Sequence, residues 1–116
     1  MVEIINFDSS KKRVLEFDEW KGYEGVPEHT RGALLRYRDH GLPPGSFLTS
    51  VLSNDLFGAV GRADHQNIHA LKDICTWINM RMPAIAWGDI ERVGNWVDEG
   101  GIVGRQKRTE KEQEDV

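Results

Sequence analysis

The chain has 116 residues, a net charge of -4, a hydrophobic fraction of 39% and a charged fraction of 29%, which suits one domain with a single core. The acidic balance argues against broad, non-specific binding of nucleic acid, because such binding needs a basic surface, although it leaves room for a local basic patch. The single cysteine excludes an intramolecular disulfide, and no apolar run approaches the ~18–20 residues of a membrane span. No signal peptide is predicted, so we expect a cytoplasmic protein that makes no membrane contact.

The first 26 residues contain the pattern that favours strands. Residues 2–7 are rich in branched and aromatic side chains, a polar turn follows, and apolar and acidic residues alternate over 15–18. This predicts two short strands that form a hairpin, with an extended arm as the alternative. Because a lone hairpin is marginally stable, it must pack on helices or on a second subunit.

The rest of the sequence predicts a mainly α-helical domain of about four helices in residues 27–101. The first helix is expected to begin within 27–30 and to end near His40. Thr30 is an acceptable N-cap for it, and Gly41 stands where a C-cap glycine belongs.

The second helix is predicted to run from Ser46, as its N-cap, to about Ala63, because its apolar residues recur with i, i+3, i+4, i+7 spacing. The third is predicted over 66–80, before Pro83. Asp64 is a possible cap for the third helix. Alternatively, the second and third helices form one bent helix.

The fourth helix is predicted over 89–98, with Asp89 as N-cap and Gly100 at its end. The tail, residues 102–116, is charged and has no apolar period after Val103. We therefore predict that it is disordered unless a partner orders it. The expected core consists of Leu48, Val51, Leu52, Leu56, Val60, Ile68, Leu71, Ile74, Ile78, Val93 and Trp96.

The turn before the second helix is a candidate anion site. The first backbone amides of a helix lack intrahelical partners and lie at the positive end of the macrodipole. The short connection could bring cations from the first helix to this point. The alternative is that Ser46 only caps its own helix and that the prolines only end the previous one. The candidate ligand-binding residues are Arg36, Arg38, His40, Ser46, Phe47, Leu48 and Thr49.

Two further groups are candidates for an interface. Two glycines inside the second helix each cost up to ~1 kcal/mol relative to alanine, so a closely approaching neighbour should compensate for them. Residues 75–87 are rich in Met and Trp, which are enriched at interfaces. Packing within the domain is the alternative for both groups. The candidate interface residues are Gly58, Gly61, Trp77, Met80, Met82 and Trp87.

Catalytic and metal-binding patterns are weak. His65 and His69 are four residues apart and share a helix face, which is the spacing of metal ligands. However, Gln66 stands where a zincin has its catalytic glutamate, and no third ligand is evident. We therefore expect no metal, no cofactor and no enzymatic activity.

The block from Gly41 to Val97 contains PPGSFL, SNDL, GRAD at a helix joint and WG before the last helix. With these features it resembles a family of small proteins, without a settled activity, that tailed phages and prophages encode. The resemblance implies an accessory factor that binds a host protein or sequesters a host immune signal. It assigns no catalytic residue.

Three functions are compatible with the sequence. The first hypothesis is a non-catalytic homo-oligomer that binds and sequesters a small anionic ligand, for example a nucleotide immune signal. The second is an interaction module that binds and inhibits a host protein, through the Met/Trp surface or the N-terminal segment. The third is a small metal-dependent enzyme, which would need His65 and His69.

Overall fold

The computed structural model describes residues 18–114, and within them the chain forms six α-helices, one 3-10 helix and no strand. The mainly α-helical fold predicted from the sequence is confirmed. Most of the predicted N-terminal hairpin or arm falls on residues 1–17, which lie outside the described residues. In chain order the elements are α2 (Glu28–His40), α3 (Ser46–Leu52), α4 (Leu56–Arg62), α5 (His65–Arg81), the 3-10 helix η1 (Ala84–Ala86), α6 (Ile90–Glu99) and α7 (Gly101–Glu114).

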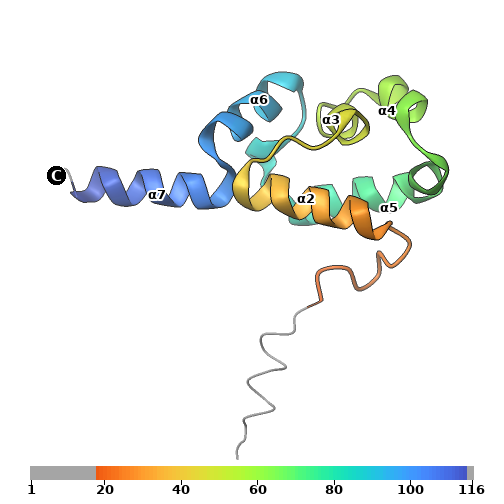
Figure 1. The fold of residues 1–116 in the computed structure, drawn as a ribbon, viewed down its shortest axis with the longest axis horizontal. Coiled ribbons are helices and arrows are strands. Elements are labelled where there is room, and N and C mark those ends of the chain that lie inside the picture. Colours follow the sequence, from red (N-terminus) through yellow and green to blue (C-terminus); the bar gives the residue numbers. More distant parts are fainter. Residues whose placement is uncertain (1–17, 115–116) are drawn as a thin grey trace, which may run out of the picture.

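Helix α2 is hydrogen-bonded to three other elements, α5, η1 and α6. Figure 1 shows α3, α4 and α6 above the level of α2 and α5, with α7 leaving at one end. The Thr30 hydroxyl on α2 donates a buried hydrogen bond to the Asn67 side chain on α5, at 2.7 Å. The Tyr37 hydroxyl donates to the Ala86 carbonyl of η1 at 2.6 Å, and the Trp96 indole on α6 donates to the Tyr37 carbonyl at 2.9 Å. These bonds satisfy buried polar groups and fix the relative positions of the four elements.

Three predicted helix ends are confirmed. Gly41 follows α2 in the left-handed conformation, with φ of 66°, and its amide donates to the Tyr37 carbonyl. Asp64 caps α5 by accepting from the backbone amide three residues on, at 2.7 Å. Asp89 caps α6 in the same way, at 2.8 Å. Because Asp64 begins a new helix, α4 and α5 are separate rather than one bent helix.

Two predicted N-caps are wrong. The Thr30 amide already donates to the Pro27 carbonyl at 3.0 Å, so α2 begins earlier and Thr30 is a buried residue inside it. Gly45, in extended backbone, occupies the cap position of α3, and the Ser46 side chain makes no capping hydrogen bond. The Gly45 carbonyl accepts from the Thr49 amide at 3.0 Å, which places Ser46 inside the first turn.

The helix predicted over 46–63 is divided by a turn at Asn54. Asn54 has φ of 66°, a left-handed conformation that asparagine tolerates better than most residues. The Asp55 amide donates to the Ser50 carbonyl at 2.8 Å, which closes α3. The Asp55 carboxylate accepts from the Gly58 amide at 3.0 Å, which caps α4.

This turn reorients α4, so its apolar residues no longer continue the buried stripe of α3. Leu56 and Val60, predicted to lie in the core, have exposed fractions of 62% and 49%. Ile68 on α5, also predicted to lie in the core, is 37% exposed. Ala59 is the buried residue of α4.

The core forms around stacked and hydrogen-bonded aromatic rings. Trp20 stacks on Trp77 with ring centroids 4.4 Å apart, and the Trp77 indole donates to the Glu19 carbonyl at 3.2 Å. Of the predicted core, Val51 and Leu71 are only partly buried. The predicted core residues that are buried are Leu48, Leu52, Ile74, Ile78, Val93 and Trp96.

The tail predicted to be disordered is the helix α7. Its first turn packs Ile102 against the core, and the guanidinium of Arg105 bonds to Glu99. These contacts and the uninterrupted run of helix-forming residues after Gly104 explain the difference. Residues 106–113 are exposed, and Figure 1 shows this part of α7 projecting from the domain.

Two glycines join the end of α2 to the start of α7 by direct backbone contact. Gly41 and Gly101 both have positive φ, 66° and 69°. A Cβ at Gly41 would lie 2.8 Å from the Gly101 nitrogen, and a Cβ at Gly101 would lie 2.6 Å from the Gly41 nitrogen. No other residue type fits either position, and we call this contact the glycine crossing.

Candidate protein-interaction surface

The hydroxyl face of α3 contains part of the predicted ligand site. Ser46, Thr49, Ser50 and Ser53 recur with helical spacing and line one open cavity, of about 810 Å³. Its charged lining residues are Arg62, Asp55 and Asp89, so acidic groups outnumber basic ones. The Arg62 guanidinium already donates to the Ser50 hydroxyl at 3.1 Å. This composition disfavours an anionic ligand.

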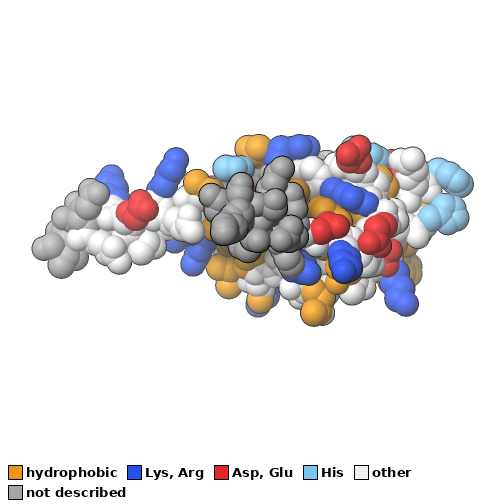
Figure 2. Space-filling model, turned by 90° about the horizontal axis from the view of Figure 1, so that it is seen from below, with side chains coloured by type: hydrophobic (Ala, Val, Ile, Leu, Met, Phe, Trp, Pro, Cys, Tyr) orange, Lys and Arg blue, Asp and Glu red, His pale blue; other side chains and the backbone are white. Residues whose placement is uncertain are grey.

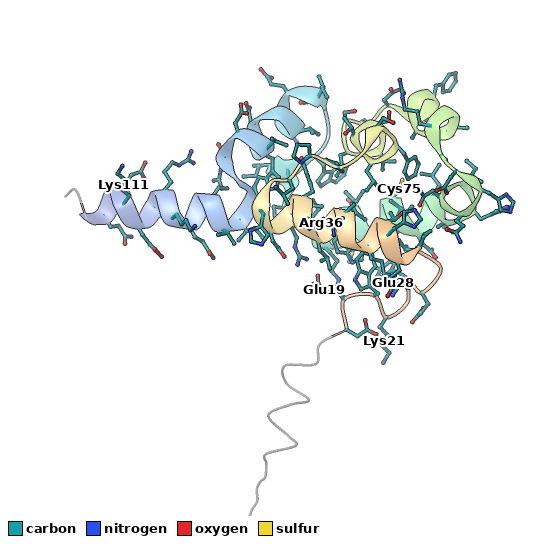
Figure 3. The ribbon with its side chains drawn as sticks, in the orientation of Figure 1. Glu19, Lys21, Glu28, Arg36, Cys75 and Lys111 are labelled. Carbon is teal, nitrogen blue, oxygen red and sulfur yellow. The ribbon has the colours of Figure 1, made fainter. Side chains whose placement is uncertain are left out.

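The cations predicted to complete that site do not line the cavity. Arg38 is paired with Glu19 and Asp39, and its guanidinium lies 5.7 Å from the centre of the Trp77 ring. The hydrogen bond with Glu19 raises the pKa of Arg38, which stays charged within this cluster. Arg36 and His40 are exposed on α2, where Figure 3 marks Arg36. Anion binding at Ser46 therefore stays a prediction without a convergent set of cations.

Phe47 and Leu48 contribute side chains to the core rather than to an open site. Their face of α3 lines a smaller cavity, of about 210 Å³, together with the buried Thr30 and Asn67. The charged residues of its rim again have both signs, and His29 lies 3.6 Å from Asp64. Helix α3 has seven residues, so its macrodipole is small.

The Met/Trp segment is mostly core, which corrects the interface prediction. Trp77 and Met82 are buried, and Trp87 is partly buried with its indole nitrogen enclosed and without a hydrogen-bond partner. Met80 is 66% exposed and is the predicted member that does lie on the surface. Trp77 was a candidate interface residue because it lies off the apolar stripe of Ile74 and Ile78; its stacking partner, Trp20, precedes all the predicted helices.

The two glycines of α4 have different surroundings. A Cβ at Gly58 would approach the tips of the Asp55 and Arg62 side chains, so this glycine leaves room for the cap of α4. A Cβ at Gly61 would meet no atom within 4 Å. Among residues 18–114, no close helix contact therefore explains Gly61.

An apolar groove lies between α4 and α5, closed at one end by α3. Its cavity measures about 300 Å³, and Figure 3 shows Cys75 between α5 and the α3–α4 pair. Burial raises the pKa of the Cys75 thiol. Polar residues line part of the rim, namely Asn54, Asp55 and Lys72. The apolar lining, which defines the α4–α5 groove, consists of Val51, Leu56, Ala59, Leu71 and Cys75.

Apolar side chains extend the groove beyond its cavity. Val60 lies one turn beyond Leu56 on α4, and Ile68 lies one turn before Leu71 on α5. All of them except Leu71 count among the exposed large hydrophobic side chains. Sequence reasoning missed this surface because it assumed a continuous helix over 46–63. The signal that could have found it is the turn-forming Ser-Asn-Asp at 53–55.

Histidines gather at the end of the molecule opposite α7, as Figure 2 shows. The rings of His65 and His69 meet edge to face, with centroids 4.9 Å apart. Within residues 18–114, no group of three or more His, Cys, Asp or Glu residues is arranged to hold a metal ion.

The comparisons with known proteins add no family to this picture. No protein-family model, no curated protein and no solved structure matches the chain. Among the residues that the structure describes, no helix combines the length and the apolarity needed to cross a membrane.

Proposed function

We propose that the protein is a non-catalytic interaction module that binds another protein through the α4–α5 groove. The observation that carries the proposal is an apolar cavity lined by Leu56, with Val60 and Ile68 one helical turn from lining residues; all three side chains are accessible to water. A cavity of this size suits one large apolar side chain as an anchor, and apolar anchors in pockets dominate many protein interfaces.

The exposed side chains favour a protein over a small apolar ligand. Covering what remains exposed of Leu56, Val60 and Ile68 would contribute about 3 kcal/mol, given about 1.5–3 kcal/mol for each fully buried side chain. A ligand confined to the cavity would leave most of this gain unrealised. The exposed apolar side chains on α4 and α5 suit the apolar face of a helix from the partner.

The charged residues at the rim of the groove can orient a partner but give no net electrostatic attraction. Asp55 and Lys72 carry opposite signs on the lining, so the groove has no net preference for an acidic or a basic partner. We expect a partner helix with an apolar face and mixed flanking charges. The resemblance to phage and prophage proteins supports a host protein as this partner.

A probe at the rim of the groove allows a direct test. In a Cys75→Ser chain, Lys72→Cys carries a photo-crosslinking maleimide beside the groove without filling its cavity, and the labelled protein is irradiated in a host-cell extract. We expect one crosslinked protein of defined mass. The crosslink should disappear in Leu56→Glu and persist in Ile90→Glu, because Ile90 on α6 is similarly exposed, at 64% against 62%, but lies away from the groove.

Circular dichroism establishes that each variant is folded. A crosslink that survives Leu56→Glu would show that the captured protein does not occupy the groove. Absence of any crosslinked protein from the extract would also count against the proposal.

A further inference from the structure

We propose that the cavity between α2, α3 and α5 binds a small, uncharged, planar molecule with an amide-like edge, such as a nucleobase. This cavity measures about 210 Å³, and we call it the Asn67 cavity. The inference goes beyond the proposed function and does not rest on the α4–α5 groove, with which this cavity shares no lining residue. Away from its charged rim, the lining includes Thr30 and Ala33 from α2, Phe47 and Leu48 from α3, and Asn67 from α5.

The side-chain amide of Asn67 is buried, but only part of its hydrogen-bonding capacity is used. Asn67 is 6% exposed, and its Oδ1 accepts at 2.7 Å from the hydroxyl of Thr30, which is 2% exposed. Within residues 18–114, no group accepts a hydrogen bond from the Asn67 Nδ2. In this part of the chain, the fully enclosed polar atom without a partner is the indole nitrogen of Trp87. The Asn67 Nδ2 is therefore not sealed off, and a ligand in the cavity that it lines can reach it.

The unused atoms of Asn67 form an edge that fits another amide. An asparagine side chain has two donor hydrogens and two acceptor lone pairs. The bond from Thr30 uses one lone pair, so a donor and an acceptor remain on neighbouring atoms. Nucleobases have the complementary pair of groups, and asparagine binds adenine through two such hydrogen bonds. Because Thr30 already fixes the orientation of the amide, binding needs little reordering of Asn67.

The size and the apolar lining of the cavity suit a single flat ring system. Its volume lies below the ~300–1,000 Å³ of sites for drug-sized molecules. At ~30 Å³ for each water molecule, it corresponds to about seven waters, which is the scale of a small heterocycle. Ala33, Phe47 and Leu48 provide apolar contact, and a flat ligand packs well against an aromatic ring such as that of Phe47.

The charged residues of the rim favour an uncharged ligand. Asp64 is acidic, Arg62 is basic, and the His29 Nε2 lies 3.6 Å from the Asp64 carboxylate. The Arg62 guanidinium is already bonded to the Ser50 hydroxyl and lies 3.8 Å from the Asp55 carboxylate. The opposite signs give an ion no net attraction, and burial of an unpaired charge in an apolar cavity is costly.

Titration of the full chain with adenine, cytosine and uracil tests the proposal by NMR spectroscopy, which reports each asparagine side chain separately. At least one base should bind, with a Kd between about 10 µM and about 1 mM for a ligand of this size. Toluene, a flat ring without an amide-like edge, should bind at least about tenfold more weakly, because it makes neither hydrogen bond. The Nδ2 resonances of Asn67 should shift on binding, whereas those of Asn95, which is exposed on α6, should not.

Two variants test the cavity in different ways. Asn67→Leu removes the amide at similar size and should weaken binding by about tenfold or more. Ala33→Leu fills the cavity but keeps the hydrogen bond between Thr30 and Asn67, so it tests the site even where loss of that bond unfolds Asn67→Leu. Ala84→Leu is the matched control, because it adds the same side chain to an alanine of η1 outside the cavity, and it should bind like the unmodified chain. Circular dichroism establishes that each variant is folded.

The nucleoside monophosphate of the base that binds identifies the source of the ring. Tighter binding of the monophosphate than of the base supports a nucleotide whose phosphate stays outside the cavity, and weaker binding supports a free base. Absence of any shift at Asn67 with all three bases up to about 1 mM overturns the inference. Equal binding of toluene, or binding that persists in Ala33→Leu, also overturns it. Because these titrations use the purified chain, their failure is distinct from failure of the crosslink in a host-cell extract.

Discussion

Replacing Trp77 with alanine is expected to destabilise the fold severely, although the sequence also made this residue a candidate for an interface. Trp77 has 0% exposure, stacks on Trp20 with an interplanar angle of 9°, and donates to the Glu19 carbonyl. Truncation of a buried tryptophan costs about 3–5 kcal/mol. Loss of the stacked pair adds about 0.5–1.5 kcal/mol, and loss of the hydrogen bond about 1 kcal/mol.

The expected loss of about 5 kcal/mol is a large part of the 5–15 kcal/mol that typical domains have. It corresponds to a fall in Tm of about 15–25 °C for a domain of this size. Urea unfolding followed by far-ultraviolet circular dichroism measures the loss without using tryptophan fluorescence, which the substitution itself changes. Trp77→Phe retains a ring for stacking and should lose less than half as much.

Met80→Ala is the control on the same helix, because Met80 is largely exposed and its truncation should change the free energy of unfolding by less than about 0.5 kcal/mol. If Trp77→Ala lowers the free energy of unfolding by less than about 1.5 kcal/mol, the reasoning from the stack is refuted. The alternative, that Trp77 contacts another protein, would then be favoured.

Four further predictions concern local features. Asn54→Val should lower stability by about 1–2 kcal/mol because its φ is positive, whereas Asn54→Gly should be nearly neutral; thermal unfolding compares the two. Asp64→Ala should cost about 1 kcal/mol through loss of the α5 cap, and urea unfolding of this variant would contradict the assignment if the midpoint did not move. Burial raises the pKa of Tyr37 above its ordinary value, so only the unfolded chain ionises near pH ~10; stability should fall above that pH, and less so in Tyr37→Phe. Truncation after Thr109 should leave Tm unchanged within about 2 °C, because the residues removed from α7 lack packing contacts.

The helices and their caps were largely predictable, because they depend on short-range patterns. Asp64, Asp89 and Gly41 act where the sequence places them, since a cap requires only a suitable residue next to a helical period. The turn at Asn54 was not predicted, because apolar residues keep helical spacing across it. That spacing cannot distinguish one continuous helix from two helices joined by a left-handed residue.

The burial of Trp77 and the pairing of Arg38 were harder to predict than the helices, because both depend on long-range contacts. Trp77 lies in the core since Trp20, far away in the sequence, covers it. Arg38 is unavailable to a ligand at Ser46 since Glu19 holds it. Both partners lie before α2, in the segment that the sequence predicts as a hairpin or an extended arm, and that pattern does not indicate which helices the segment contacts. The anionic-ligand hypothesis needed Arg38 to be free, and this depends on a long-range contact. The α4–α5 groove instead follows from one local turn, at Asn54.

The glycine crossing has a consequence for protein engineering. Because Gly41 and Gly101 touch backbone to backbone, main-chain contact holds the start of α7 in addition to the packing of Ile102 and the pairing of Arg105 with Glu99. The exposed residues 106–113 can therefore be varied while α7 keeps its direction, although neither glycine tolerates replacement. The exposed residues 106–113 extend roughly 12 Å at 1.5 Å per residue. A protein whose first helix continues α7 without a break would therefore be held at a defined distance and orientation. The domain could therefore serve as a scaffold that holds a fused protein for display or imaging.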